Sequence, residues 1–212
     1  MQKVIFSFLL LLAHPLLNGQ NTIRITPQGE ALKSFYHSLN VENHWIAGNH
    51  VNWETGEPDK PEAQSSTHTH CSAFVAAACK KMNFYILRPP EHDQLLLANA
   101  QYEWLPTQEA INAGWKLIWG AQAFINAQEL ANNGKVVVAI CMNPDLKKPG
   151  HAALVMPAET TTNKIGDDGP FVIMAGTHNF NKISLKHGFM SHIISWPATN
   201  ILFYYNDHLP QL

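Results

Sequence analysis

The chain has 212 residues and a formal net charge of −2, with 14 Lys and Arg residues against 16 Asp and Glu residues. This length suits one ordinary domain, and the lack of a basic stripe argues against a nucleic-acid partner. Only 14% of the residues are charged, and such a composition favours a polar, near-neutral ligand over a polyanion.

The first 19 residues have the pattern of a secretory signal peptide. Lys3 supplies the positive charge, an apolar run follows, and Gly19 is the small residue before a cleavage site. A buried N-terminal helix is the alternative, but Pro15 would break it. The run is also shorter than the roughly 20 apolar residues of a spanning helix. We therefore expect a signal peptide over 1–19, one mature domain over 20–212, export to the periplasm or medium, and no stable membrane insertion.

The mature domain is predicted to open with a short helix over residues 30–39. Residues 40–70 follow as a long irregular segment that several Gly and Pro residues interrupt. A loop of this length is often functional. Its tryptophans, Trp45 and Trp53, either line a cleft or cover the edge of the core.

The clearest helix is predicted over residues 72–82, where apolar side chains recur at helical spacing. Cys71 extends the same stripe by one residue, and the many alanines predict close packing on several sides, as in a central helix. Two further helices are expected over residues 94–104 and 121–132, the second closed by Asn133 and Gly134.

After Gly134 the pattern changes from helices to strands. Buried strands are predicted over residues 135–142, 151–156, 171–175 and 201–205, with a polar loop over residues 157–170 between the second and third. Helices first and adjacent strands afterwards, joined by short connections, predict an α+β domain with a mostly antiparallel sheet.

Three cysteines are an odd number for an exported chain, which indicates a thiol kept free for chemistry. Cys71 lies where a loop becomes a helix, so unpaired N–H groups and the helix dipole should lower its pKa and hold an oxyanion. Ser72 and His70 flank it. Cys79 and Cys141 lie on buried elements and are expected to act as small hydrophobic residues, and any disulfide would join these two.

A nucleophilic thiol needs a general base, and His151 at the start of a strand is the candidate. By itself such a histidine is as readily a core residue, but the upstream Cys71 favours a functional role. A third polar group should orient the imidazole. Asn179 is preferred because a neutral amide does not compete for the proton, and His178 is the alternative.

Three short motifs carry a family resemblance. Cys-Ser-Ala-Phe-Val at residues 71–75 opens a helix, Gly-His-Ala-Ala-Leu-Val at residues 150–155 lies on a strand, and a polar residue closes the next strand. Their order resembles the papain-like cell-wall amidases and endopeptidases of the NlpC and CHAP types, over residues 44–205 as topology. The resemblance implies an exported bacterial enzyme that hydrolyses amide bonds in peptidoglycan peptides without a metal or cofactor.

Carried over by position, the resemblance makes Cys71 the nucleophile, His151 the base and Asn179 the orienting residue. Ser72, His70 and Trp53 are expected around the oxyanion site and the cleft.

Two other functions remain open at this point. One is a zinc-dependent hydrolase, because His68, His70 and Cys71 lie close together in sequence, and His151 or His178 can supply a distant ligand. The other is a catalytically silent domain of the same fold that binds the cell wall.

Overall fold

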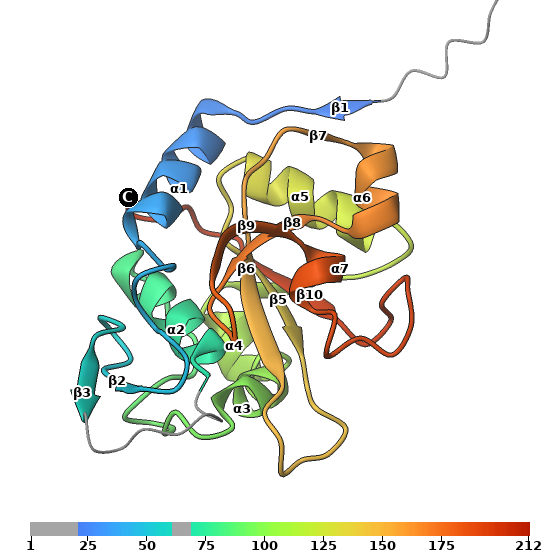
Figure 1. Cartoon of the computed structure of the whole chain (residues 1–212). Helices are drawn as coiled ribbons and strands as arrows, with labels where there is room; N and C mark the ends of the chain where they lie inside the picture. Colours follow the sequence, from blue (N-terminus) through green and yellow to red (C-terminus); the bar gives the residue numbers. More distant parts are fainter. Residues whose placement is uncertain (1–20, 61–68) are drawn as a thin grey trace, which may run out of the picture.

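The computed structural model describes residues 21–60 and 69–212. Its centre is a six-stranded sheet in which every neighbouring pair is antiparallel (Figure 1). The predicted α+β class with an antiparallel sheet is thereby confirmed. From one edge to the other the strands are β4 (Trp115–Ile118), β10 (Leu202–Asn206), β5 (Val137–Cys141), β6 (His151–Val155), β8 (Phe171–Met174) and β9 (Phe180–Ser184).

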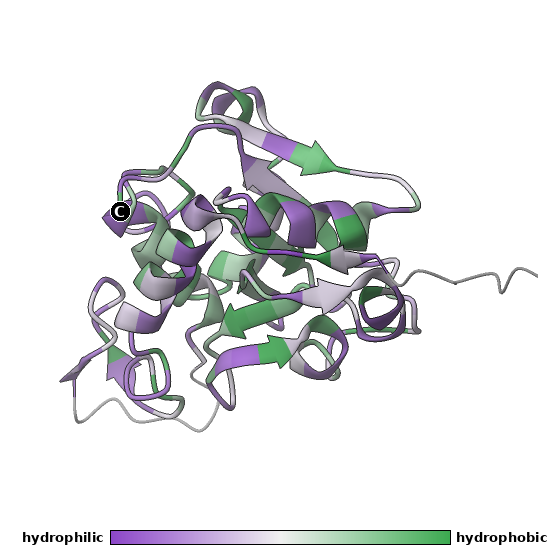
Figure 2. Ribbon diagram, turned by 90° about the horizontal axis from the view of Figure 1, so that it is seen from above, coloured by the Kyte–Doolittle hydropathy of each residue, from purple (hydrophilic) through white to green (hydrophobic). Residues whose placement is uncertain are grey.

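Helices cover both faces of this sheet, and each face has its own hydrophobic core. One core joins the sheet to α1 (Pro27–Ser38), α2 (Cys71–Lys81), α3 (Leu97–Trp104) and α4 (Gln108–Asn112). The other joins it to α5 (Ala123–Asn132) and α7 (Leu185–Gly188), while α6 (Thr162–Asp168) packs against these two helices. Apolar residues are concentrated on the central strands, as Figure 2 shows.

Successive residues of the central strands alternate between the two cores, because side chains of a strand point to opposite faces. In β6, Ala152 and Leu154 pack on the α2 side, whereas Ala153 and Val155 pack on the α5 side. This double burial explains why the strands read as continuous apolar runs in the sequence. By the same alternation, the side chain of His151 lies on the α5 side of the sheet.

Helix α2 begins at Cys71, as predicted, and its first nine residues are buried. Its alanines allow close contact with β6 and β8 on one side and with α3 on another. The exposed Lys80 and Lys81 lie in the last turn, where positive charge suits the helix dipole. The helix is thus a central packing element whose N-terminal residue is the candidate nucleophile.

Two short strand pairs lie outside the main sheet. β1 (Thr22–Ile23) pairs with β7 (Thr160–Thr161), and β2 (His50–Val51) pairs with β3 (Pro58–Lys60). The prediction of an irregular segment over residues 40–70 is therefore wrong within its described part, because β2 and β3 form a small ribbon there.

The predicted polar loop over residues 157–170 is also wrong, since it contains β7 and α6. The edge strand β4 lies between the predicted helices over residues 94–104 and 121–132, in a stretch for which no element was predicted. In the described part of the chain, no helix has the length and apolarity to cross a bilayer. The expected signal peptide lies outside the described residues.

Candidate active site

Cys71 occupies the first position of α2 and is 3% exposed. Four donors near its sulfur act to lower the pKa of the thiol: the backbone N–H groups of Cys71, Ser72 and Ala152, and the Ser72 hydroxyl. Three of these come from the start of the helix, where N–H groups have no partner within the helix. The fourth comes from β6 and belongs to the residue that follows His151. The thiol therefore lies at the junction of α2 and β6.

Burial raises the pKa of the Cys71 thiol above its ordinary value, although the surrounding N–H and O–H donors act in the opposite direction. The expectation of a lowered pKa is therefore wrong for the unliganded protein. The free energy needed to remove a thiolate from water is larger than the stabilisation that these donors give it. The resting form of Cys71 at neutral pH is the protonated thiol.

The imidazole of His151 is enclosed by rings. It meets Phe189 edge-on, with centroids 4.5 Å apart, and stacks on His192 at 4.8 Å with an interplanar angle of 15°. Burial, and then the neighbouring His192, lower the pKa of His151 to about 3. The ring is consequently neutral at physiological pH, which is the form that can accept a proton.

The Nε2 atom of His151 is buried and has no hydrogen-bond partner among the described residues. The structure places Cys71 beside the backbone of β6 but shows no hydrogen bond between the thiol and the imidazole in this part of the chain. Catalytic hydrogen bonds are often long in unliganded enzymes and tighten when the substrate binds.

His192 was not found by the sequence analysis. It follows α7, and hydrogen bonds hold its backbone on both sides. The His192 N–H donates to the Phe189 carbonyl (2.7 Å), and Asn200 Nδ2 donates to the His192 carbonyl (2.8 Å). Burial lowers the pKa of His192 as well. No local pattern separates this residue from the other histidines of the chain, so only the fold brings it to His151.

Asn179 has a different place from the predicted one. Its Nδ2 donates to the carbonyls of Val41 (2.7 Å) and His44 (2.8 Å), and its Oδ1 accepts from Gly176 N–H (2.9 Å). The amide thus ties the turn after β8 to the segment before β2. None of the hydrogen bonds of Asn179 goes to His151.

Asn179 still affects the site through the backbone. A Cβ atom placed on Gly176 would lie 3.5 Å from His151 Cε1, so the residue that Asn179 holds forms part of the wall beside the imidazole. His178, the alternative third residue, is exposed in the same turn. The expected orienting hydrogen bond to His151 is therefore supplied by neither residue.

A cleft of about 790 Å³ lies next to this junction, and we call it the hairpin cleft. It is lined by the β2–β3 ribbon (His50, Trp53, Lys60), the residues before α2 (Thr69, His70), the segment before α3 (Pro89, Asp93–Leu96) and the β5–β6 loop (Lys147–Pro149). Cys71 and His151 are not among the lining residues. His70, which directly precedes Cys71, is the lining residue next to the candidate nucleophile in the sequence.

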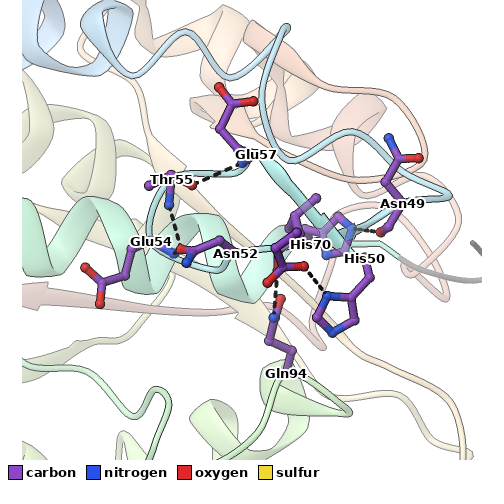
Figure 3. A network of polar contacts seen from close by, with 10 residues as sticks. Asn49, His50, Asn52, Glu54, Thr55, Glu57, His70 and Gln94 are labelled. Carbon is purple, nitrogen blue, oxygen red and sulfur yellow. Dashed lines mark hydrogen bonds and ion pairs between the residues drawn. The ribbon is translucent and has the colours of Figure 1, made fainter. Parts of the chain in front are cut away.

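The two tryptophans of the 40–70 segment have different roles. Trp53 lines the hairpin cleft, whereas Trp45 is fully buried against Phe74 with ring centroids 5.3 Å apart. The Trp45 indole N–H donates to the Trp53 carbonyl at 3.0 Å, so the core residue anchors the cleft residue. His70 is held in a similar way, through its Nε2 and the Asn49 carbonyl at 2.8 Å (Figure 3).

The other candidate ligands and thiols are also placed. In residues 21–60 and 69–212, no three His, Cys, Asp or Glu side chains gather as a metal site. His68, which belongs to the predicted zinc set, lies outside the described residues. All three cysteines are free and buried, and burial raises the pKa of both Cys79 and Cys141 to about 12.

Comparison with models of known protein families and with curated proteins finds no match to this chain.

Proposed function

We propose that this chain is an exported bacterial cysteine hydrolase of papain-like fold that cleaves amide bonds in peptidoglycan peptides. The observation that carries the proposal is the junction of α2 and β6. A cysteine begins a buried helix there, with Ser72 and Ala152 donors at its sulfur, and His151 is the residue next to Ala152. This junction supplies a nucleophile and N–H donors. The mechanism requires the imidazole of His151, which packs against Phe189 and His192 on the α5 side of the sheet, to turn toward the sulfur.

In the proposed mechanism, the Cys71 thiol loses its proton to the imidazole of His151 as the sulfur attacks the amide carbonyl. Helix N–H groups near Ser72 stabilise the oxyanion of the tetrahedral intermediate. The His151 imidazolium then protonates the leaving amine, which breaks the C–N bond and leaves an acyl-enzyme. Water, deprotonated by the same imidazole, hydrolyses the thioester and restores the thiol.

The depressed pKa of His151 keeps the ring neutral but makes it a weak base toward the Cys71 thiol, whose pKa is raised. A ring with a pKa of about 3 is a neutral base throughout the physiological range, so proton acceptance does not depend on a preformed ion pair. The raised pKa of Cys71 makes a protonated thiol the starting point. Proton transfer from Cys71 to His151 is then favoured only when a bound substrate displaces the side chains that cover the thiol. The substrate must also stabilise the charge that develops on the sulfur and the imidazole.

Two structural features bear on the papain-like assignment. The chain order is a cysteine-bearing helix followed by a histidine-bearing strand of an antiparallel sheet. The hairpin cleft leads to that helix start through His70 and offers Trp53 as an aromatic wall. The third member of the triad is the weakest part of the resemblance, because Asn179 binds elsewhere and His192 stacks on His151 instead.

Digestion of purified peptidoglycan, followed by mass analysis of the products, tests the proposal. We expect new amine and carboxyl ends on the stem peptides with the wild-type protein, and none after alkylation of Cys71. Activity that survives complete alkylation would disprove a thiol mechanism. Loss of activity with a chelator and its return with zinc would favour the zinc hydrolase, and binding to the wall without cleavage would favour the silent domain.

A further inference from the structure

Three lysines give the hairpin cleft a local positive charge. Lys60 comes from the end of β3, and Lys147 and Lys148 come from the β5–β6 loop, whereas Asp93 is the one carboxylate among the described lining residues. The chain as a whole carries a net charge of −2. The cleft therefore departs from the average surface, and its ligand can differ from the near-neutral one that composition favours.

Two of these ammonium groups are available to a ligand. Among the described residues, no carboxylate lies within ion-pair distance of Lys60 or Lys147. Lys148 pairs with Asp145 at 3.6 Å, and both side chains are largely exposed. Asp59, which precedes Lys60 in the sequence, is bound to His50 at 2.5 Å.

Hydrogen bonds hold the lysine-bearing wall in place. Asn99 on α3 donates from Nδ2 to the Lys148 carbonyl (3.0 Å) and accepts at Oδ1 from Gly150 N–H (2.8 Å) and Asn143 N–H (3.2 Å). Gln94 donates to the Val51 carbonyl at 2.9 Å and so connects the segment before α3 to β2 (Figure 3). These bonds fix the base of the β5–β6 loop at Asn143, Lys148 and Gly150, so this part of the wall requires little ordering when a ligand binds, while Lys147 lies in the exposed tip.

Part of the lining is apolar. Leu95 is 73% exposed, and it lies in the cleft lining together with Leu96, Pro89 and Trp53. Lys80 lies 5.3 Å from the centroid of the Trp53 ring, and Glu54 neutralises it in an ion pair at 2.5 Å. Cationic and apolar walls that face one space suit a ligand with a carboxylate on one side and aliphatic groups on the other.

We propose that the hairpin cleft binds a peptide through a free carboxylate, which Lys60 and Lys147 recognise. The inference rests on the proposed function, for which it specifies the substrate: an acyl donor with an ionised carboxyl group near the amide to be cleaved. The carboxylate lies in the cleft, and the chain of the peptide leads past His70 toward Cys71. Amidated forms of the same peptide lose this attraction and are poorer ligands.

Titration calorimetry with the Cys71→Ala protein tests binding without turnover. The probes are a peptidoglycan stem tetrapeptide with free carboxylates and the same peptide amidated at those groups. We expect the free acid to bind about tenfold more tightly than the amidated peptide. Lys60→Gln and Lys147→Gln should each reduce this affinity ratio by about threefold. High salt should reduce the preference, because exposed charges are screened.

Lys164→Gln on α6 is the matched control, since it removes an exposed lysine far from the cleft (Figure 1). It should leave both affinities unchanged. Equal affinity for the two peptides, binding of neither, or an intact preference in the Lys60→Gln/Lys147→Gln double variant would overturn the inference. A preference for the free acid without cleavage by the wild-type protein would support the inference and reject the proposed function. Cleavage without this preference would support the proposed function and reject the inference.

Discussion

The two ends of helix α2 each hold a buried cysteine, but in different surroundings. At the N-terminal end, the sulfur of Cys71 lies among three N–H groups and a hydroxyl. Toward the C-terminal end, Cys79 is packed in an apolar core, and its pKa rises to about 12 through burial, with only the charge of Arg88 acting the other way. The same residue type on the same helix therefore has two roles, and donors rather than burial separate them.

This contrast shows why exposure alone is a poor guide to a reactive thiol. Cys71 and Cys79 are 3% and 0% exposed, so the difference in accessibility is negligible. What differs is whether the surroundings can stabilise a negative charge as it forms. A helix start next to a strand supplies such donors, whereas the middle of a helix has already used its N–H groups.

The sharpest test of the contrast replaces each cysteine in turn. Cys71→Ala should reduce amide hydrolysis by on the order of 10³-fold or more, because no other group takes over nucleophilic attack. Cys79→Ala should leave the turnover number within about twofold and lower the free energy of unfolding by about 1 kcal/mol, through a small cavity. Product release from peptidoglycan and thermal unfolding measure the two effects. Equal loss of activity in both variants would show that the ends of α2 do not differ as proposed.

The polar end of α2 also depends on a neutral His151. The pKa of His151 is about 3 in the folded protein, while an unfolded chain has an ordinary histidine pKa of about 6.5. The unfolded chain therefore takes up the proton first, so this stabilising contribution is present above about pH 6.5 and is lost as the pH falls toward 3.

Between pH 6.5 and 4.5, the wild-type protein should lose about 2 kcal/mol more stability than His151→Gln, because the slope rises from half of about 1.4 kcal/mol per pH unit at pH 6.5 to nearly the full value at pH 4.5. Denaturant unfolding at several pH values measures this difference. His178→Gln is the control, because His178 is exposed in the turn after β8. Parallel curves for wild type and His151→Gln would mean that His151 does not stay neutral in the folded state.

Asn179 tests whether the wall beside the active site is structural. Asn179→Ala removes donors to Val41 and His44 and an acceptor from Gly176, and should lower the free energy of unfolding by about 2 kcal/mol. Because the amide acts on His151 only through Gly176, turnover should fall less than in Cys71→Ala. Denaturant unfolding measures the loss of stability, and steady-state kinetics at the same temperature compare the turnover of Asn179→Ala with that of Cys71→Ala. A loss of turnover equal to that of Cys71→Ala, with unchanged stability, would restore Asn179 as a direct partner of the imidazole.

The smallest expected effect is in thiol labelling. Iodoacetamide should modify Cys71 about tenfold faster than Cys79 or Cys141 near neutral pH, since its donors stabilise the thiolate that reacts. The advantage should shrink in His151→Gln, where the base is missing. Peptide mapping by mass spectrometry reports the three rates. Fastest labelling of Cys79 would contradict the comparison between the two ends of α2.

The sequence predicted those parts that local pattern determines. The start of α2 at Cys71 and the strands β5, β6 and β8 follow from helical spacing and apolar runs, because both faces of the sheet are buried. The strand β4 was missed because it pairs with β10, which lies far along the chain, and two of its four residues are exposed. Short apolar segments of this kind cannot be assigned by periodicity alone.

The site was predictable only in part for a related reason. Cys71 and His151 each begin an element, so position within the sequence marks them. His192 comes from the segment after α7, and it reaches His151 only because that segment folds back over the α5 side of the sheet. Asn179 was misassigned because the sequence gives no sign of its bonds to the carbonyls of Val41 and His44.

The amide of Asn99 also has a consequence for how this protein can vary. Its single oxygen receives N–H groups from both ends of the β5–β6 loop, Asn143 and Gly150, and so closes the loop at its base. The tip at residues 144–147 is exposed and is tethered only to itself. Insertions or exchanged sequences at this tip can therefore alter specificity without shifting His151, which makes the loop a natural place for divergence and for grafting.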